Sequence, residues 1–255
     1  MMYIFLDEIQ NVPSYERVVD SLYVKENIDI YIVRSTNHPI THLNSQYIEI
    51  HVLPLSFKEV YKPGTDKEEA FQKYMKTGGF PYINQIQLNK EQIGMYLEGI
   101  NNTVIVKDME TLCESYLYYP VEVMNISGKE VLKSNKKYYV VDPGILNYIL
   151  PKQSYDLEFM IENIVYLELL RRRYIVNIGR SGLAMVDFIA KRNDVYTYIQ
   201  VTASLVDKNT FNREIRPLKL IEDNYEKIIL TLDRYTLRNY DGIKVINLID
   251  WLLEE

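Results

Sequence analysis

Cysteine, tryptophan and histidine are scarce in this chain of 255 residues, with one, one and three copies respectively. The single cysteine, Cys113, excludes a disulfide within the chain and any zinc site built on several cysteines. The histidines have no cysteine or carboxylate at the spacing of metal ligands, so the sequence predicts no zinc site. Such sparing use of cysteine is typical of a reducing compartment, and we expect a cytoplasmic protein.

Long apolar runs and a strong positive charge are also missing. No run approaches the ~18 apolar residues that a membrane-spanning helix needs, and no signal peptide precedes the first predicted strand, so no membrane partner is expected. The net charge of −6 argues against a surface that binds nucleic acid throughout, although it leaves room for a local basic patch. In contrast, hydrophobic residues make up 47% of the chain, enough for a buried core, and tyrosine alone occurs 23 times.

The first half of the chain alternates short apolar runs with amphipathic segments, which predicts an α/β fold with parallel strands. Strands are expected at Tyr3–Leu6, Ile28–Val33 and Tyr47–Leu53, and a helix is expected to follow Pro13-Ser14. Further helices are predicted over Lys67–Lys76, Glu91–Lys107, Glu110–Tyr118 and from Pro143 to Ile149, and two strands are predicted to flank a turn at Ser127-Gly128-Lys129.

A boundary is predicted at Pro151–Ser154, after which the order of elements changes. The order expected there is a long buried helix, a three-stranded meander, a helix, two strands and a final helix. These elements are predicted at Tyr155–Arg173, Tyr174–Ile178, Met185–Ala190, Tyr196–Val201, Thr210–Ile221, Ile228–Leu232, Ile243–Ile246 and Leu248–Leu253. The predicted domains are therefore 1–62, 63–150 and 151–255.

The first predicted strand ends in two acidic residues, Asp7 and Glu8. Four apolar residues followed by Asp-Glu are what nucleotide hydrolysis needs at a strand end, where the Asp holds magnesium and the Glu orients the attacking water. An ordinary core strand that runs into an acidic turn fits this short segment equally well. The matching phosphate-binding loop, G-x-x-x-x-G-K-[ST], does not occur in these 255 residues. The chain by itself is therefore predicted not to hydrolyse ATP.

Several strings of the sequence resemble a widespread prokaryotic family of AAA-type ATPases with a C-terminal domain of unknown function. The resemblance is carried by Tyr3–Tyr23 (YIFLDEIQNVPSYERVVDSLY), Tyr47–Lys58 (YIEIHVLPLSFK), Gly78–Tyr82 (GGFPY), Glu162–Tyr174 (ENIVYLELLRRRY) and the stretch from Asp187 to Leu253. It implies a partial P-loop-NTPase-like parallel sheet, a helical linker with a degenerate winged-helix remnant, and a restriction-endonuclease-like α/β domain. Intact relatives are expected to use ATP and magnesium.

The departures from the family pattern bear on function. Met1-Met2 stand where the family has the P-loop strand and its helix, so the chain resembles an N-terminally truncated copy for which no cofactor is expected. Asp7 would bind a metal only if a P-loop were supplied in trans. Val33–Asn37 replaces the usual sensor segment, and most of a helical section between Asp108 and Tyr116 is absent.

The resemblance to a nuclease-like core implies a second set of residues. That chemistry requires an Asp on one strand and Glu-x-Lys on the next, so that carboxylates hold magnesium and the lysine steadies the attacking water. Asp187 matches the first position and Glu162 a helical acid, whereas Gln200 and Thr202 occupy the Glu-x-Lys positions. Lys219 is a candidate for a lysine supplied from elsewhere.

Three hypotheses of function follow. The leading one is a truncated, non-catalytic member of the AAA-type family. The second is a module that binds a protein or nucleic acid through an inactive nuclease-like domain, and the third is an active metal-dependent nuclease. Arg171-Arg172-Arg173 is a candidate nucleic-acid contact, although basic residues at a helix C-terminus also complement the helix dipole. The sequence alone does not identify the partner.

Overall fold

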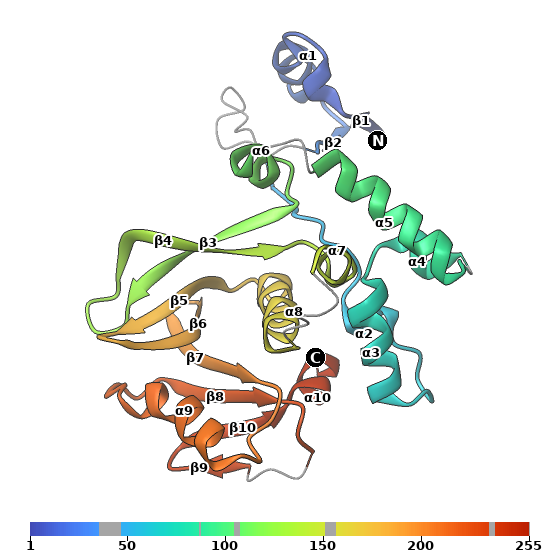
Figure 1. Cartoon of the computed structure of the whole chain (residues 1–255). Coiled ribbons are helices and arrows are strands. Elements are labelled where there is room, and N and C mark those ends of the chain that lie inside the picture. The colour runs from blue at the N-terminus through green and yellow to red at the C-terminus, as the bar shows by residue number, and fades with distance from the viewer. Residues whose placement is uncertain (36–46, 87, 105–107, 151–156, 235–237, 255) are drawn as a thin grey trace. The chain divides into compact units, whose positions relative to one another are not determined.

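The computed structural model describes residues 1–35, 47–86, 88–104, 108–150, 157–234 and 238–254 (Figure 1). The chain forms two compact units, each built from two stretches. Unit 1 comprises Met1–Val52 and Lys107–Tyr118, and unit 2 comprises Leu53–Val106 and Tyr119–Glu255. Both are mixtures of helices and strands with parallel strand pairs, which confirms the predicted α/β class. Within the described residues, no helix combines the length and the apolar character needed to cross a membrane.

Unit 1 contains a two-stranded parallel sheet. Strand β1 (Met2–Asp7) pairs with β2 (Ile28–Val33), in register from Met2 opposite Ile28 to Asp7 opposite Val33. A 3₁₀ turn, η1 (Ile9–Asn11), and helix α1 (Tyr15–Tyr23) connect them, and α6 (Met109–Glu114) belongs to the same unit. Tyr15 and Val19 of α1 are buried against Leu6, Ile9, Ile30 and Ile32. These contacts cover one face of the sheet with α1.

The predicted strand Tyr47–Leu53 is wrong. These residues form no strand, and the apolar side chains of those in unit 1 face solvent: Ile48 is 90% exposed and Val52 83% exposed. Apolar alternation favours a strand, but a strand also needs a neighbour for its backbone hydrogen bonds. Among the described residues of unit 1, β1 and β2 pair only with each other.

Unit 2 is built on an eight-stranded mixed sheet with the order β4-β3-β5-β6-β7-β8-β10-β9. The pairs β3/β5, β7/β8 and β8/β10 are parallel, and β5/β6, β6/β7 and β10/β9 are antiparallel. The strands are β3 (Tyr118–Asn125), β4 (Glu130–Val140), β5 (Ile175–Ser181), β6 (Ala184–Arg192), β7 (Val195–Thr202), β8 (Glu226–Thr231), β9 (Asn239–Tyr240) and β10 (Ile243–Asn247). The two-residue strand β9 is not predicted by the sequence pattern.

Two helices pack on this sheet from opposite faces. Helix α8 (Leu157–Arg171) presents Tyr166, whose ring lies 6.3 Å from that of Phe188 on β6. Helix α9 (Lys208–Lys219) buries Ile215 and Leu218 in a cluster with Ile189, the next residue of β6. Successive side chains of a strand point to opposite faces, so α8 and α9 lie on different sides of the sheet. Helix α8 is buried on nearly all sides, as predicted from a sequence that is apolar on most sides of the helix.

The remaining helices of unit 2 pack at one end of the sheet: α2 (Phe57–Val60), α3 (Lys67–Thr77), α4 (Pro81–Gln85), α5 (Lys90–Val104), α7 (Pro143–Ile149) and α10 (Leu248–Leu253). Asp142 joins two of these segments, because its carboxylate accepts hydrogen bonds from the backbone N–H of Gly79 (2.6 Å) and of Gly144 (2.8 Å). The unit therefore extends across the predicted division at 150/151, and residues 151–156 lie outside the described ones. The three predicted domains stay a prediction.

Candidate functional site

The acidic pair Asp7-Glu8 lies at the carboxyl end of β1, the edge at which α/β sheets bind ligands. Asp7 ends the strand with an exposed side chain. Glu8 turns the chain into η1 with a left-handed backbone (φ 48°, ψ 38°), which is uncommon for a residue other than glycine. The N–H of Glu8 donates to the carbonyl of Val33 on β2 (3.0 Å), so the acidic pair is fixed to the end of both strands.

The Glu8 carboxylate is engaged within unit 1. Its Oε2 accepts hydrogen bonds from the amide of Gln10 and from the hydroxyl of Ser35, the latter at 2.8 Å. Ser35 follows β2, where the family pattern has its sensor segment. The Gln10 amide donates through its nitrogen, and its oxygen, Oε1, is buried without a hydrogen-bond partner among the described residues. The residues present do not fit a nucleotide phosphate, because none of these groups is a lysine or a glycine-rich loop of backbone N–H groups.

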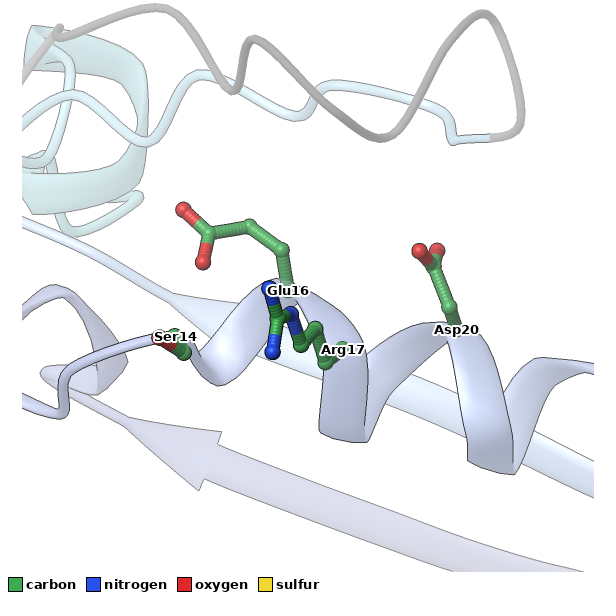
Figure 2. Close-up of a pocket in the computed structure, with 4 residues that line it drawn as sticks. All are labelled: Ser14, Glu16, Arg17 and Asp20. Carbon is green, nitrogen blue, oxygen red and sulfur yellow. The ribbon is translucent and has the colours of Figure 1, made fainter.

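A surface pocket of about 430 Å³ lies elsewhere on unit 1, along the start of α1. Its lining residues are Ser14, Glu16, Arg17 and Asp20, and Figure 2 shows the carboxylates of Glu16 and Asp20 on the same side of the helix. Ligand pockets are usually concave and mainly apolar with a few converging polar groups. This pocket has charged walls of both signs and includes neither Asp7 nor Glu8, so it does not extend the site at β1.

Unit 2 brings together the residues of the nuclease-like resemblance. The paired positions of β6 and β7 end at Phe188 opposite Ile199. Beyond that point, the side chains of Asp187 and Gln200 bind backbone N–H groups of the opposite strand. The N–H of Asp187 donates to Oε1 of Gln200 (3.3 Å), and the N–H of Val201 donates to Oδ2 of Asp187 (2.8 Å). These two side chains therefore satisfy backbone groups where the two strands separate.

Glu162 enters the site from α8 and meets a lysine that the sequence pattern does not reveal. Both oxygens of its carboxylate bind Nζ of Lys137 on β4, at 2.5 and 2.7 Å, and Tyr139 of the same strand also donates to it. Only 10% of the Glu162 side chain is exposed, against 38% for Lys137. Burial, followed by the adjacent Glu162 carboxylate, raises the pKa of Tyr139, so its hydroxyl keeps its proton and remains a donor.

Asp187 lies close enough to this ion pair to be affected by it. Burial, followed by the negative charge of Glu162, raises the pKa of Asp187 to about 8. The hydrogen bond from Val201 and the positive charge of Lys137 act in the opposite direction, and Glu214 adds to the increase. At neutral pH the Asp187 carboxyl is therefore mostly protonated.

A second group of charges lies next to Gln200 and Thr202. The Gln200 amide donates to Oε2 of Glu214 on α9 (2.7 Å), and Arg213 binds the other oxygen of Glu214 (2.7 Å). The Thr202 hydroxyl donates to Oε1 of Glu158 (3.1 Å), which lies one helical turn before Glu162. Gln200 and Thr202 thus connect the strand to acids on both helices.

These residues do not fit a magnesium centre. Glu162 already binds an ammonium group, and Gln200 stands where a carboxylate would be needed. In the part of the chain that the structure describes, no group of three or more His, Cys, Asp or Glu side chains is arranged to hold a metal ion. The arrangement is a set of charges that neutralise one another.

Two further sequence candidates have structural roles. Nζ of Lys219 binds the exposed Asp241 in the β9–β10 turn (2.7 Å), so this lysine is paired with an acid outside the nuclease-like set. Arg171 donates to the carbonyl of Pro54 (2.7 Å). Arg172 donates to the carbonyl of Trp251 (2.7 Å) and lies 4.2 Å from the centroid of its ring. These two arginines hold other segments of unit 2.

Comparison with known proteins places the chain in a family. A family model described as an AAA domain matches residues 1–61. An uncharacterized protein of Haemophilus influenzae is 31% identical over 314 aligned residues, which cover 99% of this chain and 78% of that protein. The uncharacterized protein MJ1544 of Methanocaldococcus jannaschii is 26% identical over 325 residues, covering 97% of this chain and 71% of that protein. No solved structure matches the chain significantly.

The chain belongs to the family of the Haemophilus influenzae protein, an AAA-type family. The aligned span of 314 residues is longer than the chain of 255 residues, so the relative has internal segments without a counterpart here. The AAA match ends at residue 61 and does not include the site formed by Lys137, Glu162 and Asp187.

Proposed function

We propose that this chain is a non-catalytic member of its AAA-type family, which neither binds nor hydrolyses ATP by itself. The observation that supports the proposal is the state of Glu8, the residue that would orient the attacking water. Its carboxylate is held by Gln10 and Ser35, and the sequence contains no G-x-x-x-x-G-K-[ST] motif for a phosphate-binding loop. Without backbone amides and a lysine around the phosphates, the two carboxylates of Asp7 and Glu8 repel a nucleotide.

Nucleotide titration tests this proposal. We expect no heat of ATP binding by isothermal titration calorimetry with millimolar ATP and magnesium, and no release of phosphate. Asp7→Ala is the matched variant, because Asp7 is exposed and its removal leaves the contacts of Glu8 in place. Magnesium-dependent binding in the micromolar range that disappears in Asp7→Ala would contradict the proposal.

A second candidate function is a binding module built on an inactive, restriction-endonuclease-like unit. It is supported by the order of elements from α8 to β8 and by the position of Asp187 where β6 and β7 separate. Lys137, Arg213 and the protonated state of Asp187 neutralise the carboxylates that a nuclease would use for metal binding. A protein or nucleic acid would then be bound without being cleaved.

Incubation with DNA and RNA distinguishes this module from an active nuclease. We expect no cleavage in magnesium or manganese by the wild type, and no difference between the wild type and Asp187→Ala. Cleavage that is lost in Asp187→Ala and in Lys137→Met would instead establish an active site whose lysine comes from β4. Retention of labelled DNA or RNA without cleavage would support the binding module.

A further inference from the structure

Three tyrosines surround the ammonium group of Lys129, the last residue of the turn between β3 and β4. Nζ of Lys129 lies 4.6 Å from the ring centroid of Tyr196, 4.7 Å from that of Tyr198 and 5.6 Å from that of Tyr225. These distances are within the ~6 Å over which a cation is attracted to an aromatic face. We call Tyr196, Tyr198 and Tyr225 the tyrosine cage.

A carboxylate completes the tyrosine cage. Oδ2 of Asp223 lies 3.1 Å from Nζ of Lys129 and accepts a hydrogen bond from the Tyr198 hydroxyl (2.5 Å), to which Lys129 also donates. Burial alone would raise the pKa of Asp223, but hydrogen bonds from Tyr198 and Lys129 outweigh it and lower the pKa. An ionised acid and three aromatic faces together favour a compact positive charge.

Lys129 has the least exposed side chain among the described lysines of this unit that form ion pairs. Its side chain is 26% exposed and that of Asp223 31% exposed, whereas the pair Lys219–Asp241 has values of 40% and 68%. A lysine on a protein surface normally keeps its charged group in water. The neighbouring Lys191 follows that pattern: its Nζ lies 5.5 Å from the Tyr196 ring but binds Asp194, which is 92% exposed.

Among the described residues, the turn that carries Lys129 has few other attachments to β5. Strand β3 pairs with β5 at three described positions, Val123–Asn125, and the carbonyl of Arg180 accepts from Ile126. Figure 1 shows the turn beside β5 and β6 at the edge of unit 2. Ile126 is buried in the same cluster as Tyr198, under α9. Contact between Lys129 and the tyrosine cage therefore attaches the turn to a strand three places across the sheet.

We propose that the tyrosine cage is a binding site for an alkylammonium group, that Lys129 is its resident ligand, and that this recognition holds the β3–β4 turn on the sheet. The attraction depends on a compact charge and three ring faces. A small quaternary ammonium ion therefore binds the same cage once the charge of Lys129 has been removed.

The test uses Lys129→Met, which keeps an unbranched apolar side chain and removes the charge. Hydrogen exchange at the amides of residues 126–130 is expected to increase at least tenfold in this variant. Tetramethylammonium chloride should then bind saturably, seen as shifts of the tyrosine ring signals by NMR, and should restore slow exchange; the wild type should show neither effect. Lys191→Met is the matched control, and tert-butanol and sodium chloride control for shape and ionic strength.

Two results would overturn the proposal: unchanged exchange at 126–130 in Lys129→Met, or binding of tert-butanol as strong as that of tetramethylammonium. If Lys129→Met does not fold, Tyr225→Leu in the wild-type chain provides the test, since this ring is 37% exposed at the margin of the cage. We expect Tyr225→Leu to increase exchange at 126–130 as well. Exchange equal to that of the wild type would show that the rings do not hold the turn.

Discussion

Two acids near Asp187, Glu162 and Glu214, each have a positive partner. Lys137 neutralises Glu162, and Arg213 neutralises Glu214. Ionising Asp187 would add a negative charge near Glu162, with only the hydrogen bond from Val201 and the already paired Lys137 to compensate. Its proton is therefore part of the folded structure, and releasing it costs stability.

The first prediction concerns Asp187→Asn. The pKa of Asp187 is about 8 in the folded chain and about 3.9 in an unfolded one, so the folded state holds a proton that the unfolded state has lost between these values. The stability of the wild type should thus fall as pH rises from about 4 to 8, by up to about 1.4 kcal/mol per pH unit. Asparagine still accepts from Val201 and carries no charge. Thermal denaturation should show a smaller decrease of Tm across this range and a higher Tm than wild type at pH 8.

The control for this prediction is Asp194→Asn. Asp194 has a 92% exposed side chain and pairs only with Lys191 among its described contacts. Its replacement should leave the dependence of Tm on pH between 5 and 8 unchanged. A wild-type slope that persists in Asp187→Asn would assign the titration to another buried acid, for which Asp142, with its pKa raised by burial to about 6, is the next candidate.

The second prediction at the scale of single residues concerns Gly79. A Cβ atom at this position would lie 1.9 Å from the carbonyl oxygen of Leu55, which is backbone and cannot move aside easily. Gly79→Ala should therefore destabilise the chain by about 1–3 kcal/mol or more, measured by urea denaturation. Gly94→Ala in α5 is the matched control, since nothing lies within 4 Å of its added Cβ. That change should stabilise the helix by roughly 0.5–1 kcal/mol, and equal effects of the two substitutions would contradict the packing argument.

At the scale of elements, one asparagine side chain holds α8 against β4. It makes the hydrogen bonds to β4 that a neighbouring strand would otherwise make. The amide of Asn163 accepts from the N–H of Val140 (2.8 Å) and donates to its carbonyl (2.9 Å), and all of these groups are buried. A helix cannot offer its own backbone to an adjacent strand, because those groups are already used within the helix. The asparagine therefore provides the pair of hydrogen bonds that a strand would make.

The third prediction is that Asn163→Ala destabilises unit 2 by about 2–4 kcal/mol. Both backbone groups of Val140 would be left without partners in a buried position, each at a cost of about 1–3 kcal/mol. The free energy of unfolding from urea titration measures the effect. Asn147→Ala removes an exposed and longer hydrogen bond (3.4 Å) and should cost less than about 0.5 kcal/mol. A loss as small as this in Asn163→Ala would mean that water replaces the amide.

Most helices and strands could be predicted from the sequence, because the local pattern of apolar residues agrees with the way each element packs. Strand β2 and helix α10 have the predicted bounds, and the predicted turn at Ser127-Gly128-Lys129 lies between β3 and β4. Tyr47–Leu53 fails because a strand depends on a neighbour, which a local pattern does not report. The predicted helix Glu110–Tyr118 ends early, at Glu114, and Tyr118 instead begins β3.

At the scale of the whole molecule, long-range contacts explain what the sequence could not show about the site. Glu162, Asp187, Gln200 and Thr202 could be named from a resemblance, since they lie on α8, β6 and β7, within one stretch of the sequence. Lys137 could not be named in this way, because it lies on β4, before the predicted boundary at 150/151. It meets Glu162 only because β4 and β3 belong to the same sheet as β5. The stretches Leu53–Val106 and Tyr119–Ile149 likewise belong to the same unit as the C-terminal strands.

The fourth prediction follows from this grouping. From the sequence alone, a protease-resistant fragment would be expected to begin after about residue 153. The contacts of Arg171 with Pro54 and of Asp142 with Gly79 instead place its start near Leu53. Limited proteolysis followed by mass spectrometry should therefore find the earliest cuts before residue 53, where Ile48 and Val52 are exposed. A first cut between residues 60 and 86 would show that these helices are held less firmly than their contacts imply.

Unit 1 is assembled from two separate stretches, and this has a consequence for the gene. The chain passes from one unit to the other after Val52, before Lys107 and after Tyr118. No single stop codon or start codon can therefore express either unit whole and alone. An expression clone of unit 2 needs two deletions and an artificial junction between residues 106 and 119, and an exchange of unit 1 between relatives would require three crossovers.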